Sequence, residues 1–530
     1  MNEAWGTKIF VYPGPSKKDN LRAAIHLYSK LDGDIKRRNV YGFCGWQKVN
    51  DEWLFLTGSG GITANGLIED VQVDLGTGHM QRYTLPAPPK SQEVKEIISI
   101  IYDLMNICPS KPHIGRALLS AVARAPLGEC QATDFAIFIH GLTGAKKSEI
   151  AAIALGFFGD FSARSFPANW SDTENDIEAK GFAAKDSLYV IDDFKPSVNS
   201  VESAKLHSKA ERAVRGIGNQ SARGRRTATM QSALAYYIRS MTLITGEDLP
   251  KGQSLLGRML VLELSRDDVD VAALTRLQQA RDKGQLRLLM ASYVQWLASR
   301  IDDLKKSFPA GVNAIRDTTI QDGFASSHPR APEIFANLVA GAETFFDFLS
   351  ERNAVSYDMD NDALTQISTS LKNAFQEQSA YQSEQDEVLR FFDLLRSLFS
   401  SGNAHISCRL NQGPPASRPH AWGWRSDSVD VSGEPINKPM GDSIGWYCDK
   451  GREVWLDTNA VFAAVQKLAR SQGDSFLLSA PSLWRRMNER QLIVATEKRP
   501  NGTDQLTVKR MIAGRSRRVM IVSADLVESG

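Results

Sequence analysis

The sequence predicts an α/β chain built around a parallel sheet, with a β-rich module before it and a helical region and a compact module after it. Between residues 133 and 264, short apolar segments alternate with helical segments, which is typical of parallel strands joined by crossover helices. Residues 40–85 have the alternating and glycine-containing character of short strands. Near the C-terminus, two helical segments precede strand-like segments, an order that predicts a winged helix.

The composition is that of a globular protein and excludes several classes. The chain has 530 residues, 42% hydrophobic and 23% charged, which excludes a disordered chain, a collagen and a coiled-coil rod. We expect no membrane partner, because no run of about 18 apolar residues occurs. We expect no secretory signal, because the first ten residues have no basic region followed by an apolar one. The five cysteines are scattered without a CxxC pair, so we expect a cytoplasmic protein with reduced thiols and no structural metal.

The expected elements follow from periodicity and breaker residues. Strands are expected at residues 46–61, 71–75, 81–85, 135–140, 187–191, 241–245 and 259–264. Helices are expected at 91–128, 148–158 and 204–217. Another helix is expected to begin at Ser171, with Glu174 three residues later completing a capping box. Residues 267–400 are predicted to be helical, with a stop near 307–309 and a new start after Pro329; a linker follows at 411–419. The C-terminal module should contain helices at 459–472 and 480–490 and strands at 492–496, 505–511 and 517–522.

The segment GLTGAKKS, from Gly141 to Ser148, follows a predicted strand and opens a predicted helix, as a P-loop does. Such a loop turns backbone N–H groups toward phosphates at a helix N-terminus. Lys147 would meet the β- and γ-phosphates of ATP, and Ser148 would ligate Mg²⁺. Lys146 replaces the usual glycine and must therefore fit a strained backbone conformation. The alternative is a turn before an ordinary helix. The expected nucleotide contacts are Gly141, Thr143, Gly144, Ala145, Lys146, Lys147, Ser148 and Glu149.

Two acids end the apolar segment LYVIDD, 45 residues after Lys147. Asp192 would hold Mg²⁺, and Asp193 would orient or deprotonate the attacking water, which is a Walker B arrangement. A buried strand that ends in a solvated acidic turn is the alternative. The P-loop and the two acids together predict ATP binding and hydrolysis.

Three more residues are candidates for contact with the γ-phosphate. Thr245 ends the next predicted strand and fits a sensor, or it bonds the backbone at the strand end. Arg258 precedes a strand and could act as a catalytic arginine finger on a nucleotide held by a neighbouring subunit; otherwise it is a surface arginine. Arg330, just before a predicted helix, is a candidate nucleotide contact from the lid.

Several stretches together resemble the AAA+ ATPases of mobile genetic elements, in particular the MCM-like helicases of staphylococcal cassette elements. The resemblance covers roughly residues 40–300, about half the chain. It rests on YGFCGW at 41–46, GGI at 60–62, YTLP at 83–86, the P-loop with KSE at 147–149, PANWSDT at 167–173, VIDD at 190–193, GN at 218–219, RGR at 223–225 and TGED at 245–248.

The resemblance implies an AAA+ ring, expected to be a hexamer, that translocates along DNA during replication of a mobile element. A separate primase or initiator is implied, because we expect no priming domain before residue 40. With the patterns above, it divides the chain into a β-rich module (1–89), a helical connector (90–130), an AAA+ P-loop core (131–266), a helical lid region (267–400), a linker (401–444) and a winged helix (445–530).

Two basic segments are candidate DNA contacts. Residues 205–226 hold seven Lys or Arg and one acid, and a hairpin predicted at 227–237 would bring arginines to single-stranded DNA in the ring channel. Residues 480–518 hold ten Lys or Arg and three acids, 10 minus 3 or +7, in a chain of net charge +2. This charge favours duplex DNA at the winged helix, although solvated faces, subunit contacts and protein binding remain alternatives. The candidates are Arg223, Arg225 and Arg226 in the channel, Arg485, Arg486 and Arg490 on the recognition helix, and Lys498 and Arg499 on the wing.

The sequence therefore favours an ATP-driven DNA helicase or translocase. A second hypothesis is an initiator, loader or regulator that uses ATP as a switch for DNA binding without processive unwinding, with which Lys146 and the winged helix are compatible. A third is a defence or scaffold protein with a weak P-loop. The retention of Asp192, Asp193, Thr245 and Arg258 argues against this third hypothesis.

Overall fold

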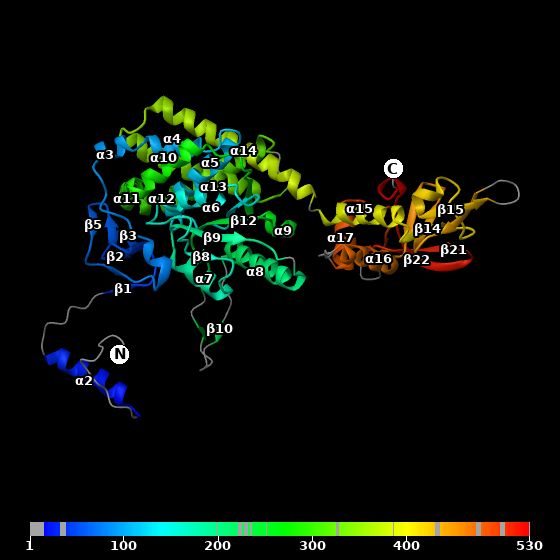
Figure 1. Ribbon diagram of the computed structural model, residues 1–530, viewed down its shortest axis with the longest axis horizontal. Coiled ribbons are helices and arrows are strands. Elements are labelled where there is room, and N and C mark those ends of the chain that lie inside the picture. The colour runs from blue at the N-terminus through cyan, green and yellow to red at the C-terminus, as the bar shows by residue number, and fades with distance from the viewer. Residues whose placement is uncertain are drawn as a thin grey trace.

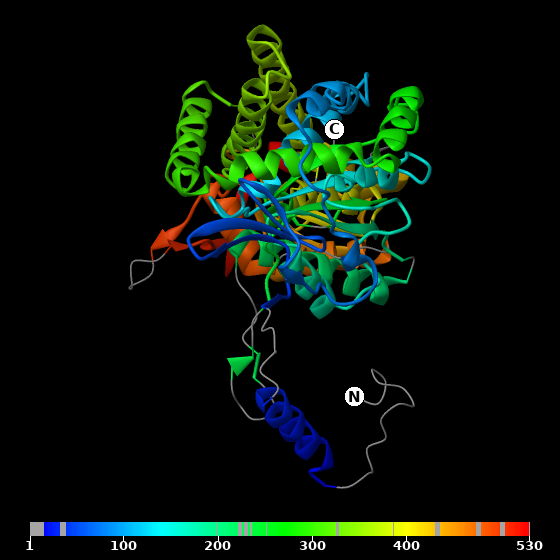
Figure 2. The same cartoon turned by 90° about the vertical axis from the view of Figure 1, so that its left-hand side faces the viewer.

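The computed structural model places most of the chain in two folded bodies that lie side by side (Figure 1). One hydrophobic core runs from Cys44 to Phe375 and a second from Val388 to Val527. Helix α2 (Lys17–Leu31) lies apart from both bodies (Figures 1 and 2). Among the described helices, none is long and apolar enough to cross a membrane. The described residues are 15–31, 39–197, 199–220, 225–226, 232–233, 236–250, 252–324, 328–384, 386–429, 435–472, 479–498 and 504–528.

The N-terminal module of the first body is a four-stranded antiparallel meander beside a short parallel pair. The prediction of a strand at residues 81–85 was wrong. A 3₁₀ turn (Gly78–Arg82) precedes Tyr83 there, and the Tyr83 hydroxyl donates to the carbonyl of Leu188 at 2.8 Å, so this segment packs on the core sheet. The meander is β2 (Gly45–Val49), β3 (Glu52–Thr57), β4 (Gly60–Thr63) and β5 (Gly66–Ile68); the pair is β1 (Val40–Tyr41) with β6 (Gln72–Val73).

Buried polar contacts fix this module to the body. The Trp46 backbone N–H donates to the Asp186 carboxylate at 2.9 Å, and its indole N–H donates to the Pro126 carbonyl at 2.6 Å. The Lys185 ammonium donates to the Trp46 carbonyl at 2.6 Å and pairs with Glu129 at 2.8 Å. Asp186 is only 1% exposed, so the contacts are shielded from water and are costly to break.

We predict that Asp186→Asn changes how stability depends on pH. Burial outweighs the Lys185 ammonium 3.4 Å away and raises the pKa of Asp186 to about 6. An unfolded aspartate titrates near pH 4. The stabilising contribution of Asp186 is therefore complete below about pH 4 and is lost as the pH rises through about 6. The free energy of unfolding of the native chain minus that of Asp186→Asn should fall between pH 4 and 7, by up to about 3 kcal/mol.

Chemical unfolding at several pH values measures this difference. Glu96→Gln, at an exposed carboxylate of the connector, is the matched control, and its difference from the native chain should stay nearly constant. A difference for Asp186→Asn that increases with pH would show that the ionised carboxylate, and not the protonated one, holds the module.

The connector between module and sheet is helical, as predicted, but it is broken into three helices. They are α3 (Ser91–Glu96), α4 (Ser99–Met105) and α5 (Pro112–Arg124). α5 is almost wholly buried and packs on α13 (Ala331–Glu351) and α14 (Tyr357–Glu384) of the later helical region. At its end, buried Arg124 donates to the Asn337 side chain at 3.0 Å and stacks on Phe308. The connector is therefore part of the core and not a flexible join.

The central sheet has five parallel strands in the order β13–β7–β12–β9–β8. β12 lies between β7 and β9, so the C-terminal ends of these three strands meet at one edge. The expected helix start at Ser171 was wrong: Thr173 is the N-cap of α7 and accepts the N–H of Asp176. The elements are β7 (Ala136–His140), α6 (Lys147–Leu155), β8 (Ala168–Asn169), α7 (Glu174–Ala183), β9 (Leu188–Phe194), α8 (Ser200–Asn219), β12 (Met241–Gly246) and β13 (Met259–Glu263).

A helical region covers the sheet and ends the first body. The prediction of a stop near residues 307–309 was wrong, because α12 runs through Pro309. Phe308 and Val312 are buried where α12 packs on α13, which offsets the hydrogen bond that proline removes. The predicted start after Pro329 is confirmed. The helices are α9 (Gln253–Leu256), α10 (Val271–Asp282), α11 (Gln285–Ala298), α12 (Ile301–Gln321), α13 (Ala331–Glu351) and α14 (Tyr357–Glu384).

The second body is a five-stranded sheet with helices on one face. Residues 401–444, expected to be a linker, contain strand β14, which pairs with β17, and the hairpin β15–β16. The strand expected at 492–496 is reduced to one bridge between Ile493 and Val522. The sheet order is β14–β17–β18–β22–β21. The elements are α15 (Glu387–Ser400), β14 (Ala404–Cys408), β15 (Trp424–Val429), β16 (Pro435–Pro439), β17 (Asp442–Cys448), β18 (Glu453–Leu456), α16 (Thr458–Ser471), α17 (Ala480–Glu489), β19 (Glu497–Lys498), β20 (Asp504–Gln505), β21 (Val508–Ile512) and β22 (Arg515–Ser523).

Candidate functional site

The loop from β7 to α6 has the backbone of an anion-binding turn. Gly141 has a φ of 157°, and a side chain there would collide with the carbonyl of Leu264 on the neighbouring strand. Gly144 has a φ of 88°. Lys146 has a φ of 65°, in the left-handed region that favours glycine, so the strain expected from the sequence is present in the backbone. The loop ends at the N-terminus of α6, where unpaired N–H groups favour an anion.

The Lys147 side chain folds back over this loop. Its ammonium donates to the carbonyl of Gly141 at 2.6 Å and to that of Leu142 at 3.0 Å. Burial lowers the pKa of Lys147, while the nearby carboxylates, Glu247 first among them, partly restore it. Thus the cation lies at the mouth of the loop, where a phosphate would replace the two carbonyls.

The predicted Mg²⁺ ligands, Ser148 and Asp192, are in contact. The Ser148 hydroxyl donates to the Asp192 carboxylate at 3.0 Å, and the Thr245 hydroxyl donates to the same carboxylate oxygen. Burial raises the pKa of Asp192 against the lowering effect of these two hydrogen bonds. Two oxygen donors at the edge of the sheet are the chemistry that Mg²⁺ prefers, so the residues fit that ion.

Asp193 occupies a bulge at the end of β9. Ile244 is opposite Ile191 and Gly246 is opposite Phe194, so Asp192 and Asp193 together face Thr245 alone. Asp193 has a φ of 66°, and its N–H donates to the Thr245 hydroxyl at 3.2 Å. The bulge turns the exposed Asp193 side chain away from the direction of Asp192. The two acids therefore differ in exposure and in the partners of their side chains.

Some residues around the loop were given no role by the sequence. Glu247, just after β12, accepts a hydrogen bond from the Thr143 hydroxyl and pairs with Lys195 at 2.9 Å. These two partners hold the pKa of Glu247 below its usual range. Arg266 donates to the Thr143 carbonyl at 3.0 Å and its carbonyl accepts from Lys146 at 3.3 Å. Their approach depends on which strands are neighbours, and the order of strands in the sheet has no local signal.

The remaining predicted loop residues have structural partners. Ala145 is wholly buried. Glu149, in the first turn of α6, accepts from the Gln278 side chain of α10 at 2.9 Å. This contact joins the phosphate loop to the helical region that follows the sheet.

Arg258 and Arg330 lie together, away from this chain's own phosphate loop. Arg258 directly precedes β13, at the opposite end of the parallel sheet, and its carbonyl accepts the N–H of Ala136 at the start of β7. Arg330 donates to the Gly218 carbonyl at the end of α8. Burial, then Arg330 and Arg215, lowers the pKa of Arg258. Five residues of strand separate this end from the P-loop by about 16 Å, so neither arginine reaches a nucleotide held in the same chain.

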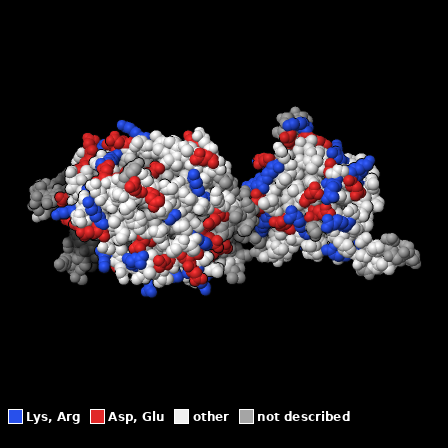
Figure 3. All heavy atoms as spheres, turned by 90° about the horizontal axis from the view of Figure 1, so that it is seen from above, with Lys and Arg blue, Asp and Glu red and all other residues white. Residues whose placement is uncertain are grey.

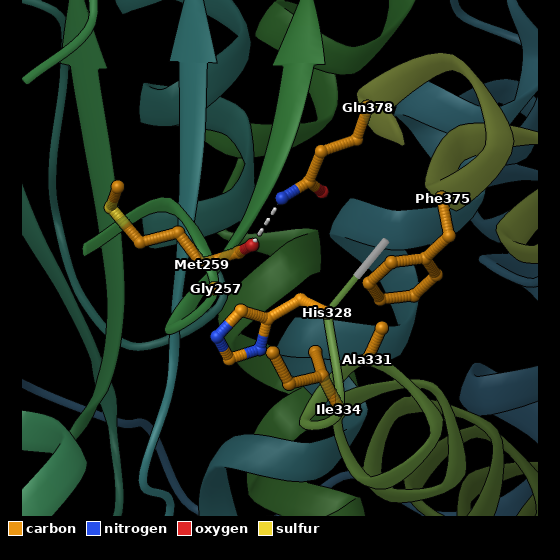
Figure 4. A pocket seen from close by; sticks show the side chains of 7 residues that line it. All are labelled: Gly257, Met259, His328, Ala331, Ile334, Phe375 and Gln378. Carbon is orange, nitrogen blue, oxygen red and sulfur yellow. Dashed lines mark hydrogen bonds between the residues drawn. The ribbon is translucent and has the colours of Figure 1, made fainter. Parts of the chain in front are cut away.

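Packing around Arg258 keeps this end of the sheet rigid. His328 lies against Gly257, and Gln378 of α14 donates to the Met259 carbonyl at 2.9 Å and accepts from Val261 at 3.1 Å (Figure 4). The cavity between them is about 10 Å³, too small for a ligand. Gln378 thereby covers the outer edge of β13, and the arginine before that strand is held in place.

Two of the candidate DNA contacts form ion pairs within the chain. Arg490 pairs with Asp386 at 2.6 Å and Lys498 with Asp504 at 2.6 Å. Arg485 is exposed and Arg486 is half-buried on α17. Lys and Arg side chains are frequent on the face of the second body seen in Figure 3. Arg223 and Arg499 lie outside the described residues, as do the side chains of Arg225 and Arg226, whose backbone forms β10, paired with β11 (Ser232–Ala233).

Comparison with known proteins finds solved structures of similar fold. No family model and no curated protein matches the sequence. The structure of SCCmec type IV Cch, described as an active helicase, superimposes with a TM-score of 0.53 at 12% identity, over 96% of this chain and 84% of that one. The apo A form of the C-terminal region of NrS-1 aligns with a TM-score of only 0.30 at 9% identity, over 96% of this chain and 90% of that one. The chain thus has a helicase-like α/β fold, and its similarity to a staphylococcal cassette helicase agrees with the resemblance seen in its motifs.

We predict that the left-handed conformation of Lys146 has a measurable cost. Lys146→Gly and Lys146→Ala both remove the contact with Arg266, and only glycine adopts a φ of 65° without penalty. The free energy of unfolding of Lys146→Gly should exceed that of Lys146→Ala by about 1 kcal/mol, measured by chemical denaturation. Equal stability of the two variants would show that the loop relaxes to an unstrained backbone.

Proposed function

We propose that this chain is an ATP-dependent DNA translocase or helicase that works as a ring. The observation that carries the proposal is the meeting of Lys147, Ser148, Asp192, Asp193 and Thr245 at one edge of the parallel sheet. Bound MgATP would supply the phosphoanhydride whose hydrolysis drives the motor. Lys147 would hold the terminal phosphates, Ser148 and Asp192 would hold the metal ion, and Asp193 would orient the attacking water.

The arginines at the far end of the sheet support an assembly of several chains. Arg258 and Arg330 are distant from the loop of their own chain and cluster beside Arg215, although like charges repel. An anion from a neighbouring chain would relieve that repulsion. We infer that Arg258 completes the site of the next subunit, in a ring that we propose to be a hexamer.

The second body supplies the proposed contact with duplex DNA. The second body contains the elements of a winged helix in the expected order: strand β18, helices α16 and α17, and then the hairpin β21–β22. Strand β22 pairs with both β18 and β21. α17, with Arg485 and Arg486, would be the recognition helix. The similar structure is described as an active helicase, which supports a role in DNA unwinding. We propose that this unwinding acts in replication of a mobile element. A separate protein would then carry out priming or initiation.

We predict that single-stranded DNA stimulates ATP hydrolysis by the full chain and that Lys147→Ala and Asp193→Ala each abolish turnover. Both variants remove a group that acts on the terminal phosphate or on the water. Phosphate release with and without oligonucleotide measures this effect. Lys283→Ala, at an exposed lysine beyond α10, is the control and should keep the native rate. Native turnover in Lys147→Ala would contradict the assignment of the site.

We also predict complementation between two inactive variants. Arg258→Ala keeps an intact phosphate loop, and Lys147→Ala keeps an intact Arg258. In an equal mixture, about one interface in four would combine the two intact halves, so about a quarter of the native rate should return. No recovery in a mixture shown to form mixed rings, by co-purification through an affinity tag on one variant only, would exclude a role for Arg258 across the interface.

A second function is an ATP-switched DNA-binding initiator or loader without processive unwinding. The observation that favours it is the strained Lys146 beside a Lys147 already bound to its own loop carbonyls. A strand-displacement assay separates the two functions. Nucleotide binding and DNA binding without ATP-dependent displacement would favour the switch.

A further inference from the structure

The sheet of the second body has one face covered by helices and one that no described helix covers. Helices α15, α16 and α17 contribute to the apolar cluster on the first face. The cluster on the other face comes from β17, β18, β21 and β22, with Ala495 packed beside it. Its largest members, Trp446 and Trp455, are direct cross-strand partners. This second face is opposite to the proposed recognition helix.

Three arginines lie over the two indole rings. The Arg517 guanidinium is 5.1 Å from the centre of the Trp446 ring, and those of Arg409 and Arg510 are 5.5 and 5.9 Å from the centre of the Trp455 ring. A guanidinium within about 6 Å of an aromatic ring is attracted by the ring quadrupole. The indoles are 7% and 5% exposed, so guanidiniums and neighbouring side chains cover them almost completely.

The arginines of this face are close to one another and lack acidic partners. Arg510 and Arg517 are directly opposite in the register of β21 and β22, where like charges destabilise a sheet. Across the described part of the chain, no carboxylate forms an ion pair with either of them or with Arg409. Glu453 lies on the same side of β18, but its carboxylate accepts the Trp455 indole N–H at 2.8 Å. The tryptophans therefore hold an array of uncompensated cations.

We propose that this surface, the Arg–Trp face (Arg409, Arg510, Arg517, Trp446 and Trp455), binds the phosphate backbone of single-stranded DNA. Guanidiniums donate paired hydrogen bonds that match phosphate oxygens. Arginines combined with aromatic rings on a positive surface are the chemistry of single-strand binding. Arg409 and Arg510 both lie over the Trp455 ring, and the Ala513 N–H between β21 and β22 donates to the Arg409 carbonyl at 3.2 Å, so the guanidiniums form one compact cluster that several phosphate oxygens of a strand can contact together.

The proposal deepens the proposed DNA function and rests on it for the choice of nucleic acid, but it does not need ATP turnover. Its test therefore uses the full chain carrying Lys147→Ala, without nucleotide. A native chain that does not hydrolyse ATP would then count against the motor alone. Arginine substitutions that leave DNA binding by the Lys147→Ala chain unchanged would count against the Arg–Trp face alone.

The test is binding of a fluorescent oligothymidine, measured by anisotropy at several salt concentrations. Arg510→Met with Arg517→Met keeps an apolar stem over each ring and removes the charge. The slope of log K against log salt should become shallower by about 1.4, at about 0.7 for each lost phosphate contact, and Kd should rise about tenfold at moderate salt. Arg510→Lys with Arg517→Lys should keep the native slope. Arg470→Met, at an exposed arginine on α16, is the matched control and should also keep it.

Arg409→Met removes the third guanidinium of the same surface, which comes from the segment after β14, and should make the slope shallower by about 0.7. If circular dichroism shows that the double variant does not fold, Arg409→Met alone tests the proposal. Unchanged slopes in folded Arg409→Met and in the double variant would overturn the proposal. The proposal would also be overturned if the substitutions weakened binding of duplex DNA but not of oligothymidine. It would be overturned as well if an oligoglutamate bound more tightly than oligothymidine and the same substitutions weakened that binding, because this result indicates an acidic protein partner.

Discussion

The site depends on one hydroxyl group, that of Thr245, held between two strands. It accepts the N–H of Asp193 at 3.2 Å and donates to the carboxylate of Asp192, which also accepts from Ser148 at 3.0 Å. β12 lies between β7 and β9, so this hydroxyl joins the phosphate loop to both acids. Thr245 is 1% exposed, and the bulge that separates the directions of Asp192 and Asp193 is built around it. The Trp170 N–H donates to the Asp192 carbonyl at 3.1 Å and the Glu247 N–H to the Phe194 carbonyl at 2.9 Å, so these bonds and the Thr245 hydroxyl together hold the irregular end of β9.

Local sequence signals predicted the elements of the core, and they failed where partners distant in the chain decide the structure. Strand-loop-helix periodicity and the acidic strand end led us to expect Ser148 and Asp192 at one edge of the sheet, where the Ser148 hydroxyl donates to the Asp192 carboxylate. Arg266 and Glu247 approach the loop only because of the strand order. α12 continues through Pro309 because it packs on α13. Residues 401–444, rich in Gly and Pro, contain β14, whose partner β17 follows a long connection, so no local pattern revealed the pairing. The placement of Arg258 and Arg330 likewise needed the whole sheet.

Counts of charged residues along the sequence do not distinguish Lys and Arg side chains that form ion pairs within the chain from those that remain open to a ligand. Arg490 and Lys498 lie in the strongly basic C-terminal segment, yet each has a carboxylate within 2.6 Å. Arg510 and Arg517, in the same segment, lie over a sheet face with tryptophans and no ion-paired acid among the described residues. Cross-strand register and ring contacts therefore separate the two groups, and neither is visible in composition.

Helix α8 connects the acids of the site to the far end of the sheet. It begins at Ser200, six residues after β9 ends with the acids of the site, and its 20 residues extend about 30 Å to Asn219. The chain then reaches β10, which lies beyond the body in both views (Figures 1 and 2), before it returns to β12 and Thr245. The last turn of α8 is fixed to the core, because Ile217 is buried there and Arg330 donates to the Gly218 carbonyl, so α8 is a strut between the acids of the site and the arginines before β13 and α13.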